Sequence, residues 1–338
     1  MSENECVYEI AILGRAVWQL HSLNNEGTVG NVTEPRSVRI IDPNTKKAVT
    51  TDGISGEMLK HIHTEIMWIL SDKNNLCAAC RVLNPEKFNF AIKTGKVKAK
   101  DVENVLTQAL QTCDMCDVHG FLIEKPTTSR KSTIEFGWAF GIPEVYRDIH
   151  THARHALGEK KSKESENQES EEETGVSTQM VYHRPTRSGV YAIISVFQPW
   201  RIGLNEARQN RYTYDVNDDV RKRRYKLVLK AYQLLFTRPE GAMTTTRLPH
   251  VEDFSGIIVY STKPIPVPVI TPLKDNYIDE IKTIAKNLVS EKDEEENETS
   301  LKVVEFKDIA DFTEKINELI NKKPYKIDLG DQQCSGQN

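Results

Sequence analysis

The chain has 338 residues, 38% of them hydrophobic, and a formal net charge of −4. This length allows one large core with insertions or two smaller units. No apolar run approaches the roughly 18 residues that a bilayer-spanning helix needs, and the polar, acidic N-terminus does not resemble a secretory signal, so we expect a cytoplasmic protein.

The negative net charge is concentrated in two segments. Glu159 to Glu173 carries seven Glu and three Lys, and Glu291 to Glu298 carries six acids and one Lys. Without these runs, of net charge −4 and −5, the rest of the chain carries about +5. The basic residues gather in four stretches: Arg36 to Arg39, Lys93 to Lys100, Arg130 to Lys131 and Arg221 to Lys230. Such stretches are typical of phosphate-binding surfaces, and also of ordinary solvated surfaces.

In chain order, the first expected strand is Val7 to Trp18, rich in aliphatic and aromatic residues. A long polar loop, Leu20 to Pro35, follows it, and a second extended stretch covers Ser37 to Ile41. Ser55 then begins a helix whose apolar residues recur at helical spacing, with Lys60 and His61 on its exposed face. The N-terminal part therefore predicts strands followed by an amphipathic helix.

A small insertion, Leu76 to Cys116, contains two cysteine pairs, a basic stretch and an expected helix at Asp101 to Leu110. Extended segments are expected near Ser132 to Phe140, Gln179 to Tyr182 and Gly189 to Phe197. The polar run Glu159 to Thr174 is too charged to bury, so we expect it to be the disordered tip of a long β-hairpin.

Helices are expected at Val220 to Phe236, Tyr277 to Val289 and Ile309 to Ile320, with strands at Ile257 to Ser261 and Leu301 to Phe306. The proline-rich segment PIPVPVITP is expected at an edge rather than inside a sheet. Interleaved strands and helices with long insertions predict an α+β fold.

Cys77 and Cys80 form one CxxC pair, and Cys113 and Cys116 form another. Two such pairs close a tetrahedral site, which favours structural Zn²⁺. Reduced cysteines or a disulfide formed on isolation are the alternatives, and a redox role is weaker because neither pair lies in a clear βαβ context. Four thiolates leave no position for water, so catalytic zinc is disfavoured.

Signatures of catalysis are missing from the sequence. The histidines, including His61 and the stretch His150 to His155, lack metal-site spacing, so we interpret them as surface or RNA-facing residues. Neither a nucleophile elbow nor a nucleotide-binding glycine loop occurs. We therefore expect no catalytic residue and no enzyme.

Three loops carry residue types that suit sugar and phosphate contact. Hydroxyls, amides and helix N-termini can hold phosphates without reading sequence. Each loop taken alone is more typical of ordinary caps and turns, so the prediction depends on their combination. The candidate residues are Ser22, Asn24, Asn31 and Thr33; Ser55 and Gly56 with Lys60; and Thr244, Thr245, Thr246 and Arg247.

In its ordered series of short motifs, most of the chain resembles the DevR autoregulator family, the backbone subunits of type I CRISPR Cascade complexes. The matching segments are GRAVWQLHSLNNEGTVGNVTEPRSV, ISGEMLKHIH, DVHGFL, SRKSTIEFGWAFGIP, SGVYAIISV and RPEGAMTTTRLP. Each motif is short, so the resemblance depends on their order.

The resemblance implies a hand-shaped subunit with a modified ferredoxin-like (RRM-like) palm, a helical finger insertion and a β-hairpin thumb. The implied palm comprises residues 1–75, 117–148 and 185–325, the finger 76–116, the thumb 149–184 with a disordered acidic tip at 158–176, and a flexible tail 326–338. Copies would stack with other Cascade subunits into a helical filament on the crRNA, which then pairs with target DNA.

The resemblance also assigns roles to residues. Ser55 and Lys60 would contact guide phosphates, with Ser22, Asn24 and Asn31 beside them. Gly241 to Arg247 would line the groove, with further contribution from His61, His119, Arg130 and Lys131. Two features depart from the family: the acidic thumb tip, and the double CxxC, which indicates a zinc-stabilised finger because so small an insertion is not expected to build its own core.

Two other functions remain open from the sequence. One is a type III-like backbone subunit that cleaves target RNA with a metal bound by Asp42 or Asp52. The other is a zinc-containing nucleic-acid-binding regulator, although no helix with a base-reading Arg, Asn or Gln face is evident.

Overall fold

The computed structural model describes residues 5–95, 97, 101–125, 127–143, 145–156, 178–207, 212–241, 244–288 and 300–328. The predicted acidic thumb tip, the second acidic run and residues 329–338 of the predicted tail lie outside the described residues. No described helix is long and apolar enough to cross a membrane.

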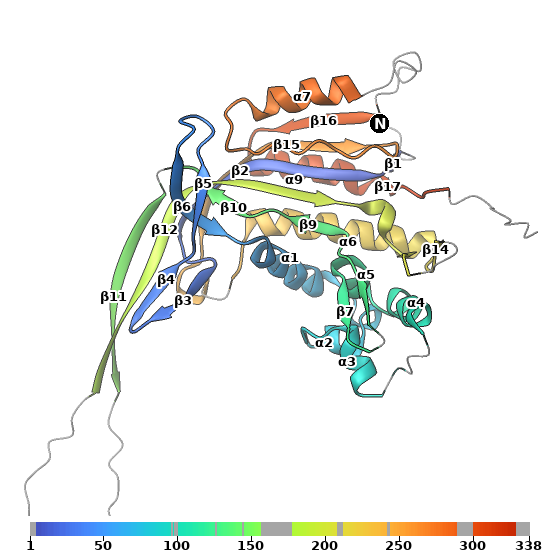
Figure 1. Cartoon of the computed structure of the whole chain (residues 1–338), viewed down its shortest axis with the longest axis horizontal. Helices are drawn as coiled ribbons and strands as arrows, with labels where there is room; N and C mark the ends of the chain where they lie inside the picture. Colours follow the sequence, from blue (N-terminus) through green and yellow to red (C-terminus); the bar gives the residue numbers. More distant parts are fainter. Residues whose placement is uncertain are drawn as a thin grey trace, which may run out of the picture.

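A large antiparallel sheet forms the centre of the molecule (Figure 1). Its strand order is β16 (Leu301–Phe306), β15 (His250–Ser261), β2 (Glu9–His21), β12 (Thr178–Phe197), β10 (Ala139–Gly141), β6 (Ala48–Ile54) and β5 (Ser37–Ile41). A further strand, β9 (Ile134–Phe136), also pairs with β12. The mixed architecture agrees with the α+β fold predicted from the sequence.

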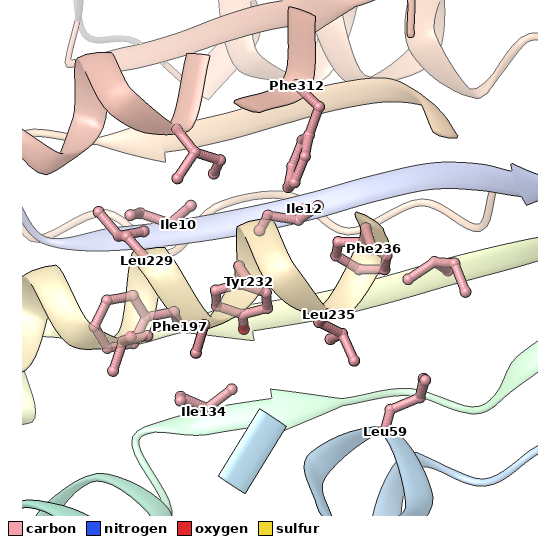
Figure 2. Packing of buried hydrophobic residues seen from close by; sticks show 14 of the residues in the cluster. Ile10, Ile12, Leu59, Ile134, Phe197, Leu229, Tyr232, Leu235, Phe236 and Phe312 are labelled. Carbon is pink, nitrogen blue, oxygen red and sulfur yellow. The ribbon is translucent and has the colours of Figure 1, made fainter. Parts of the chain in front are cut away.

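Alternating side chains of β2 separate the two faces of the sheet. Ile10 and Ile12 belong to the larger core, which is covered by helices α1 (Gly56–Leu70), α6 (Asp218–Thr237) and α9 (Ile309–Ile320) (Figure 2). Ala11 and Leu13 face the other way, against α7 (Tyr277–Leu288). Both faces are therefore buried, which explains the continuous apolar sequence of this strand.

Aromatic side chains fill the larger core where α6 and α9 meet β15. The rings of Phe236 and Phe254 stack with centroids 4.1 Å apart, and Phe312 meets both edge-on at 5.5 and 5.0 Å. Figure 2 labels Phe236 and Phe312 in this core. All three side chains are fully buried. This contact fixes both helices on the sheet, since large buried rings dominate core energetics.

The two cysteine pairs lie in a helical unit on the same side of the sheet as α1 and α6 (Figure 1). This unit, the cysteine module, comprises the described part of residues 76–130. Its elements are α2 (Ala78–Arg81), α3 (Phe88–Lys93), α4 (Val102–Thr112), α5 (Asp114–His119), β7 (Phe121–Ile123) and β8 (Thr128–Arg130). The expectation that the insertion has no core of its own is wrong, because its cysteines pack with apolar side chains such as Phe88 and Leu106 in a separate cluster.

A long hairpin projects from the sheet (Figure 1). It consists of β11 (Tyr146–Ala156) and the first half of β12, paired from Tyr146↔Ser188 to Ala156↔Thr178. The sequence predicted two separate segments where the structure has one 20-residue strand. The pairing of β12 with β2 shifts register between Arg187 and Gly189, a bulge that lets the strand pass from the hairpin into the sheet.

Shorter elements complete the fold. The hairpin of β3 (Asn25–Val29) and β4 (Val32–Pro35) lies beside β12, with Val32 paired to His183. The remaining elements are β1 (Cys6–Val7) with β17 (Lys323–Pro324), β13 (Leu204–Asn205) with β14 (Thr213–Tyr214), and the 3₁₀ turns η1 (Lys73–Asn75), η2 (Pro199–Arg201) and η3 (Thr244–Thr246).

Candidate metal centre and nucleic-acid interface

The four predicted metal ligands come together in the cysteine module. The Sγ atoms of Cys77, Cys80, Cys113 and Cys116 all lie within 4.8 Å of one another, and the four side chains are buried. Cys116 Sγ lies 3.9 Å from Cys77 Sγ and 3.7 Å from Cys80 Sγ. A tetrahedral zinc with Zn–S bonds of about 2.3 Å requires Sγ atoms about 3.8 Å apart. The arrangement therefore fits one tetrahedral ion.

The electrostatics of the four thiols also favour a cation. Hydrogen bonds from Cys113, Cys116 and Cys80 lower the pKa of the Cys77 thiol, whereas burial raises the pKa of the Cys116 thiol. Several thiolates packed so closely repel one another unless a cation neutralises them. The N–H of Cys116 also donates to Cys113 Sγ at 3.4 Å, a contact that orients a ligand sulfur. All four cysteines are free of disulfides.

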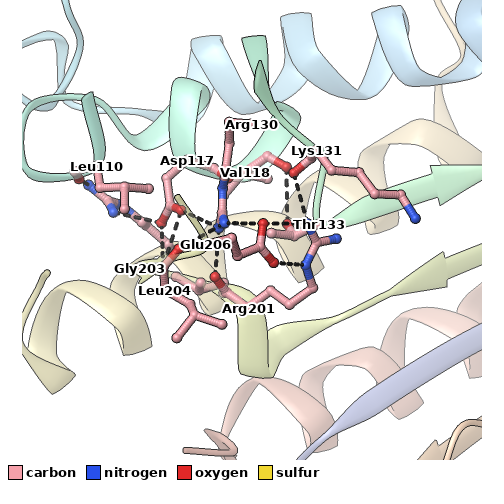
Figure 3. Close-up of polar contacts among 12 residues, drawn as sticks. Leu110, Asp117, Val118, Arg130, Lys131, Thr133, Arg201, Gly203, Leu204 and Glu206 are labelled. Atoms are coloured by element: carbon pink, nitrogen blue, oxygen red, sulfur yellow. Dashed lines mark hydrogen bonds and ion pairs between the residues drawn. The ribbon is translucent and has the colours of Figure 1, made fainter. Parts of the chain in front are cut away.

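Arg130 does not lie on the surface, so the prediction that it contacts guide RNA is not supported. Its side chain is fully buried and pairs with Asp117 at 2.8 Å and Glu206 at 2.9 Å (Figure 3). It also donates to the carbonyls of Arg201 and Leu204. The guanidinium joins the cysteine module to the segment 201–206, a structural role.

Two arginines of the basic stretch Arg221 to Lys230 are likewise buried rather than surface cations. Arg224 is fully buried on α6 and bonds Asp114 and Asp117, each at 2.7 Å. Arg221 is buried too, and donates to the carbonyls of Ile202 and Tyr325. Because these charges are matched by acids and carbonyls, they dock α6 to the module instead of offering a phosphate site.

The three loops predicted to contact phosphates do converge in space. Asn24 Oδ1 accepts a hydrogen bond of 2.6 Å from the Ser55 N–H at the start of α1. Gly241 lies over the same place, since an added Cβ there would come within 2.5 Å of Met58 and 2.9 Å of Leu23. Residues distant in sequence thus meet around the N-terminus of α1.

Several of the residues predicted to contact phosphates in this region instead bond or pack within the protein. Ser55 is buried, and its hydroxyl caps α1 by accepting from the Met58 N–H. Gly56 is buried against the carbonyl of Phe136, where any Cβ would clash at 2.2 Å. Ser22 is buried and donates to the Pro185 carbonyl. These three residues shape the loops, and their side chains are not exposed to a ligand.

Lys60 is the predicted contact whose charge lacks a protein counterion. No described acidic oxygen lies within 4 Å of its ammonium. The side chain is half-buried, and this burial lowers the pKa of Lys60, with a further lowering from the charge of Lys87. The charges of Glu135 and Glu57 act in the opposite direction, and Glu135 is itself paired with Lys131 at 2.5 Å. The ammonium of Lys60 is therefore available to bind an anion from outside the protein.

Arg247 forms a second cation centre, beside the projecting hairpin. The residue is largely buried, with 8% of its surface exposed, and its side chain lies against β11, with Nη2 3.1 Å from His152 Nε2. His152 stacks on Tyr182 of β12, and the guanidinium of Arg184 lies 5.0 Å from the same ring. An open hollow of about 310 Å³ adjoins Arg247, lined also by Leu20, His150, His152, Thr186, Thr246, Leu248 and His250. None of the described residues that line this hollow is acidic.

The other predicted contacts lie at the margins of these two centres. Asn31 is exposed and donates to the Val181 carbonyl of β12 at 3.2 Å, while Thr33 is half-exposed on β4. Thr245 and Thr246 are exposed on the loop that carries Arg247, and the Thr244 hydroxyl donates to the Gly241 carbonyl. His61 and Lys131 are exposed but pair with Glu65 and Glu135.

His119 is buried, so the prediction of guide contact through its side chain is not supported. Its Nε2 lies 2.9 Å from His63 Nδ1, and His63 Nε2 lies 3.2 Å from the Val228 carbonyl. A carbonyl only accepts, so His63 donates from Nε2 and accepts from the Nε2–H of His119. Burial lowers the pKa of both imidazoles, to about 3 for His63, which keeps this pair neutral.

Neither aspartate considered for RNA cleavage is placed as an open metal ligand. Asp52 is fully buried and is bonded by Arg187 at 3.2 Å and Tyr191 at 3.0 Å. The Asp42 carboxylate accepts from the Thr45 hydroxyl and the Asn44 N–H, which lower its pKa and close its own turn.

Some candidate residues are not evident as contacts from sequence reasoning. Arg184, Tyr182 and His152 share one face of the hairpin, and the alternation of His150 and His152 was the available signal, since residues two apart in a strand share a face. Lys87 has no sequence signal at all. It is brought near Lys60 only by the packing of the module.

Comparison with known protein families finds a CRISPR-associated family. The model of the family described as "CRISPR-associated negative auto-regulator DevR/Csa2" matches residues 12–282. Two solved chains are similar to this one. One, from a "CRISPR RNA-guided surveillance complex, pre-nicking", has 11% identity and a TM-score of 0.47 over 92% of this chain and 99% of its own. Another, from a "CRISPR RNA-guided surveillance complex", has 11% identity and a TM-score of 0.43 over 92% and 97%. No curated protein matches the chain.

Proposed function

Because this chain belongs to the CRISPR-associated DevR/Csa2 family, we propose that it is a non-catalytic backbone subunit that binds the crRNA of a Cascade-type surveillance complex. It holds the sugar-phosphate backbone of the spacer without reading its bases. Base pairing between crRNA and target DNA then supplies the sequence specificity. The partners are crRNA, further copies of the same chain in a helical filament and other Cascade subunits.

One observation carries this proposal: two cation centres, one at Lys60 on α1 and one at Arg247 beside β11, have no described acidic oxygen within 4 Å. The buried Arg130, Arg187 and Arg224 all contact carboxylates, so this protein neutralises its structural cations internally. Lys60 and Arg247 are different, because no described acidic oxygen lies within 4 Å of their charged groups. Phosphates of a bound strand would supply the missing charge and release counterions.

The residue types at the second centre suit single-stranded RNA. Tyr182 and His152 offer ring surface, while Arg184 and Arg247 offer guanidinium groups beside it. Aromatic and guanidinium planes stack on any base, so such a surface tolerates every sequence. The hollow next to Arg247 gives room for part of one nucleotide.

The parts of the fold then take the roles that the family resemblance implies. The sheet with α1, α6 and α9 is the modified ferredoxin-like, RRM-like palm. The hairpin of β11 and β12 is the thumb that reaches a neighbouring copy. The cysteine module is the finger, in which Cys77, Cys80, Cys113 and Cys116 hold a structural Zn²⁺.

The test is to purify the protein from a host that expresses a CRISPR array, and to sequence the bound nucleic acid. We expect crRNA of many spacers, bound in proportion to their abundance. Lys60→Ala should weaken binding to all spacers alike, and Lys282→Ala, which removes a lysine paired with Glu305 on α7, serves as the matched control. Nucleic-acid-free protein that ignores added guide RNA would exclude the proposal.

The same preparation separates the other candidate functions. Complementary RNA incubated with the complex and a divalent metal stays intact if the subunit is non-catalytic, and regular cleavage would favour the type III-like alternative. Selective retention of one DNA duplex over unrelated duplexes would favour a regulator. Neither alternative has a structural observation in its favour.

A further inference from the structure

Lys87 lies at the point where the cysteine module faces α1. Its ammonium donates to the carbonyl of Gly120 at 2.6 Å and to that of His119 at 3.3 Å, at the C-terminal end of α5. Lysines commonly bond carbonyls at helix ends, because these lack partners within the helix. No described carboxylate lies within 4 Å of this ammonium, so its charge is not neutralised within the protein.

Both cysteine pairs hold Lys87 in place. On one side, the Lys87 N–H bonds the Asn84 carbonyl, and the Asn84 N–H bonds the carbonyl of Ala79, which lies between Cys77 and Cys80. The next residue, Phe88, is buried in the same cluster as the four cysteines. The backbone at Lys87 has a positive φ of 50°, a conformation that ordinary residues adopt only when their surroundings enforce it.

On the other side, the second cysteine pair positions the carbonyls that Lys87 binds. The Gly120 N–H bonds the Cys116 carbonyl at 3.1 Å, and Gly120 has a positive φ of 69°. A Cβ at this glycine would lie 2.2 Å from the Arg130 carbonyl, so only glycine fits. The acceptors of the Lys87 ammonium are thus fixed directly beyond Cys116.

Lys60 approaches the same place from α1. His63, one turn after Lys60 on that helix, bonds His119, whose carbonyl accepts from Lys87. Burial first, and then the charges of His63, Lys87 and Lys60, lower the pKa of His119. Burial and the charge of Lys87 lower the pKa of Lys60, against the smaller opposing effect of Glu135 and Glu57. Two ammonium groups close enough to interact repel each other, and an anion bound between them removes this repulsion.

We propose that Lys60 and Lys87 bind one phosphate of the guide strand together, and that the metal in the cysteine module sets guide affinity by fixing Lys87. The inference rests on the proposed function and extends it, because it adds the module to the RNA-binding surface. It also gives the four cysteines a functional consequence besides stability. Metal loss would release the segment 77–87 and the turn after Cys116 together, and Lys87 with them.

The test uses the full-length, metal-loaded protein and a fluorescent single-stranded RNA, with equilibrium binding measured over a series of salt concentrations. Lys87→Ala should weaken binding roughly fivefold at 0.15 M salt and reduce the salt slope by about 0.7, the value for one phosphate contact on a single strand. Lys60→Ala should do the same. The double variant should lose less than the product of the two losses, because both lysines serve one phosphate.

Lys93→Ala is the matched control within the same module. Lys93 is paired with Glu86 and Glu124, each at 3.2 Å, so its removal should leave RNA affinity and salt slope unchanged. Metal content and circular dichroism are measured for each variant. A chelator that removes the metal should weaken RNA binding by the native chain about as much as Lys87→Ala, and should weaken the Lys87→Ala variant little further.

The outcomes separate this inference from the proposed function. If the native protein binds no guide strand, both are overturned. If it binds RNA, and Lys60→Ala weakens binding while metal-loaded Lys87→Ala does not, the inference is overturned and the proposed function stands. Metal removal that leaves a folded protein with unchanged affinity and salt slope would overturn the metal dependence.

Discussion

Replacing Asp117 by Ala tests the buried charge network that joins the cysteine module to the rest of the protein. The Asp117 carboxylate accepts from Arg130 at 2.8 Å, from Arg224 at 2.7 Å and from the Gly203 N–H at 2.9 Å, in a site without solvent exposure (Figure 3). Its removal leaves two buried guanidinium groups with fewer counterions. Breaking a buried pair in this way costs about 3 to 5 kcal/mol.

The magnitude should stay within that range because each guanidinium keeps another carboxylate. Arg130 retains Glu206 at 2.9 Å, and Arg224 retains Asp114 at 2.7 Å. With a urea m-value of about 3 kcal/mol/M, the unfolding midpoint should fall by roughly 1 to 1.7 M. Urea unfolding followed by circular dichroism and by tryptophan fluorescence measures this shift.

Asp275→Ala is the matched control, since it also removes an aspartate from an arginine pair. Asp275 bonds Arg15 at 2.9 Å, but its side chain is 75% exposed, so the loss should be less than about 1 kcal/mol. Equal midpoints for Asp117→Ala and Asp275→Ala would refute the reasoning that the network holds the module in place.

Four further predictions address the metal, the interface, the core and the pH dependence. Cys80→Ser should reduce bound zinc, measured by elemental mass spectrometry, from one per chain to well below one. Arg247→Ala should weaken single-stranded RNA binding roughly fivefold in a fluorescence anisotropy titration, whereas Arg238→Ala, which removes an exposed arginine paired with Glu240, should leave it unchanged. Phe254→Ala should cost about 3 to 5 kcal/mol in urea unfolding, because its ring packs 4.1 Å from Phe236. Burial opposes ionisation of Glu206, but the ion pairs with Arg201 and Arg130 prevail and lower its pKa below the ordinary 4.5. Its stabilisation is therefore present above about pH 4.5 and lost as the pH falls through the lowered pKa, so Glu206→Gln should flatten the acid limb of a stability profile measured by urea unfolding.

Helices and strands with one clear period could be predicted closely from the sequence. The predicted helix Ile309 to Ile320 and strand Leu301 to Phe306 have the observed bounds. The predicted helix Tyr277 to Val289 agrees with α7 throughout Tyr277–Leu288, and Val289 lies outside the described residues. Their apolar residues alternate or recur at one spacing, and their ends carry turn residues. The four cysteines could also be predicted as metal ligands from the sequence, because two CxxC pairs are typical of a tetrahedral metal site.

Other features depend on tertiary packing and could not be predicted from the sequence. The basic residues Arg130, Arg221 and Arg224 look like a surface patch in sequence, yet they are buried against acids and carbonyls that lie far along the chain. Nothing in a linear pattern separates these arginines from Lys60, which has no described acidic oxygen within 4 Å of its ammonium. Lys87 is placed by two cysteine pairs together, and a single sequence does not show that arrangement.

The β12 strand illustrates a different limit. Pro185 and Gly189 are typical of strand ends, and the sequence predicts two segments, Gln179 to Tyr182 and Gly189 to Phe197. In the structure, one strand continues through both, because β11 pairs with its first half and β2 with its second. Pairing with different partners along its length overrides the local propensity.

The most direct test of guide binding is to compare single-stranded RNAs of equal length and unrelated sequence in equilibrium titrations with the purified, metal-loaded protein. Backbone recognition predicts equal affinities for all sequences, which fall together as salt increases. Preference for one sequence by a large factor, or no binding of any RNA at low salt, would contradict the account.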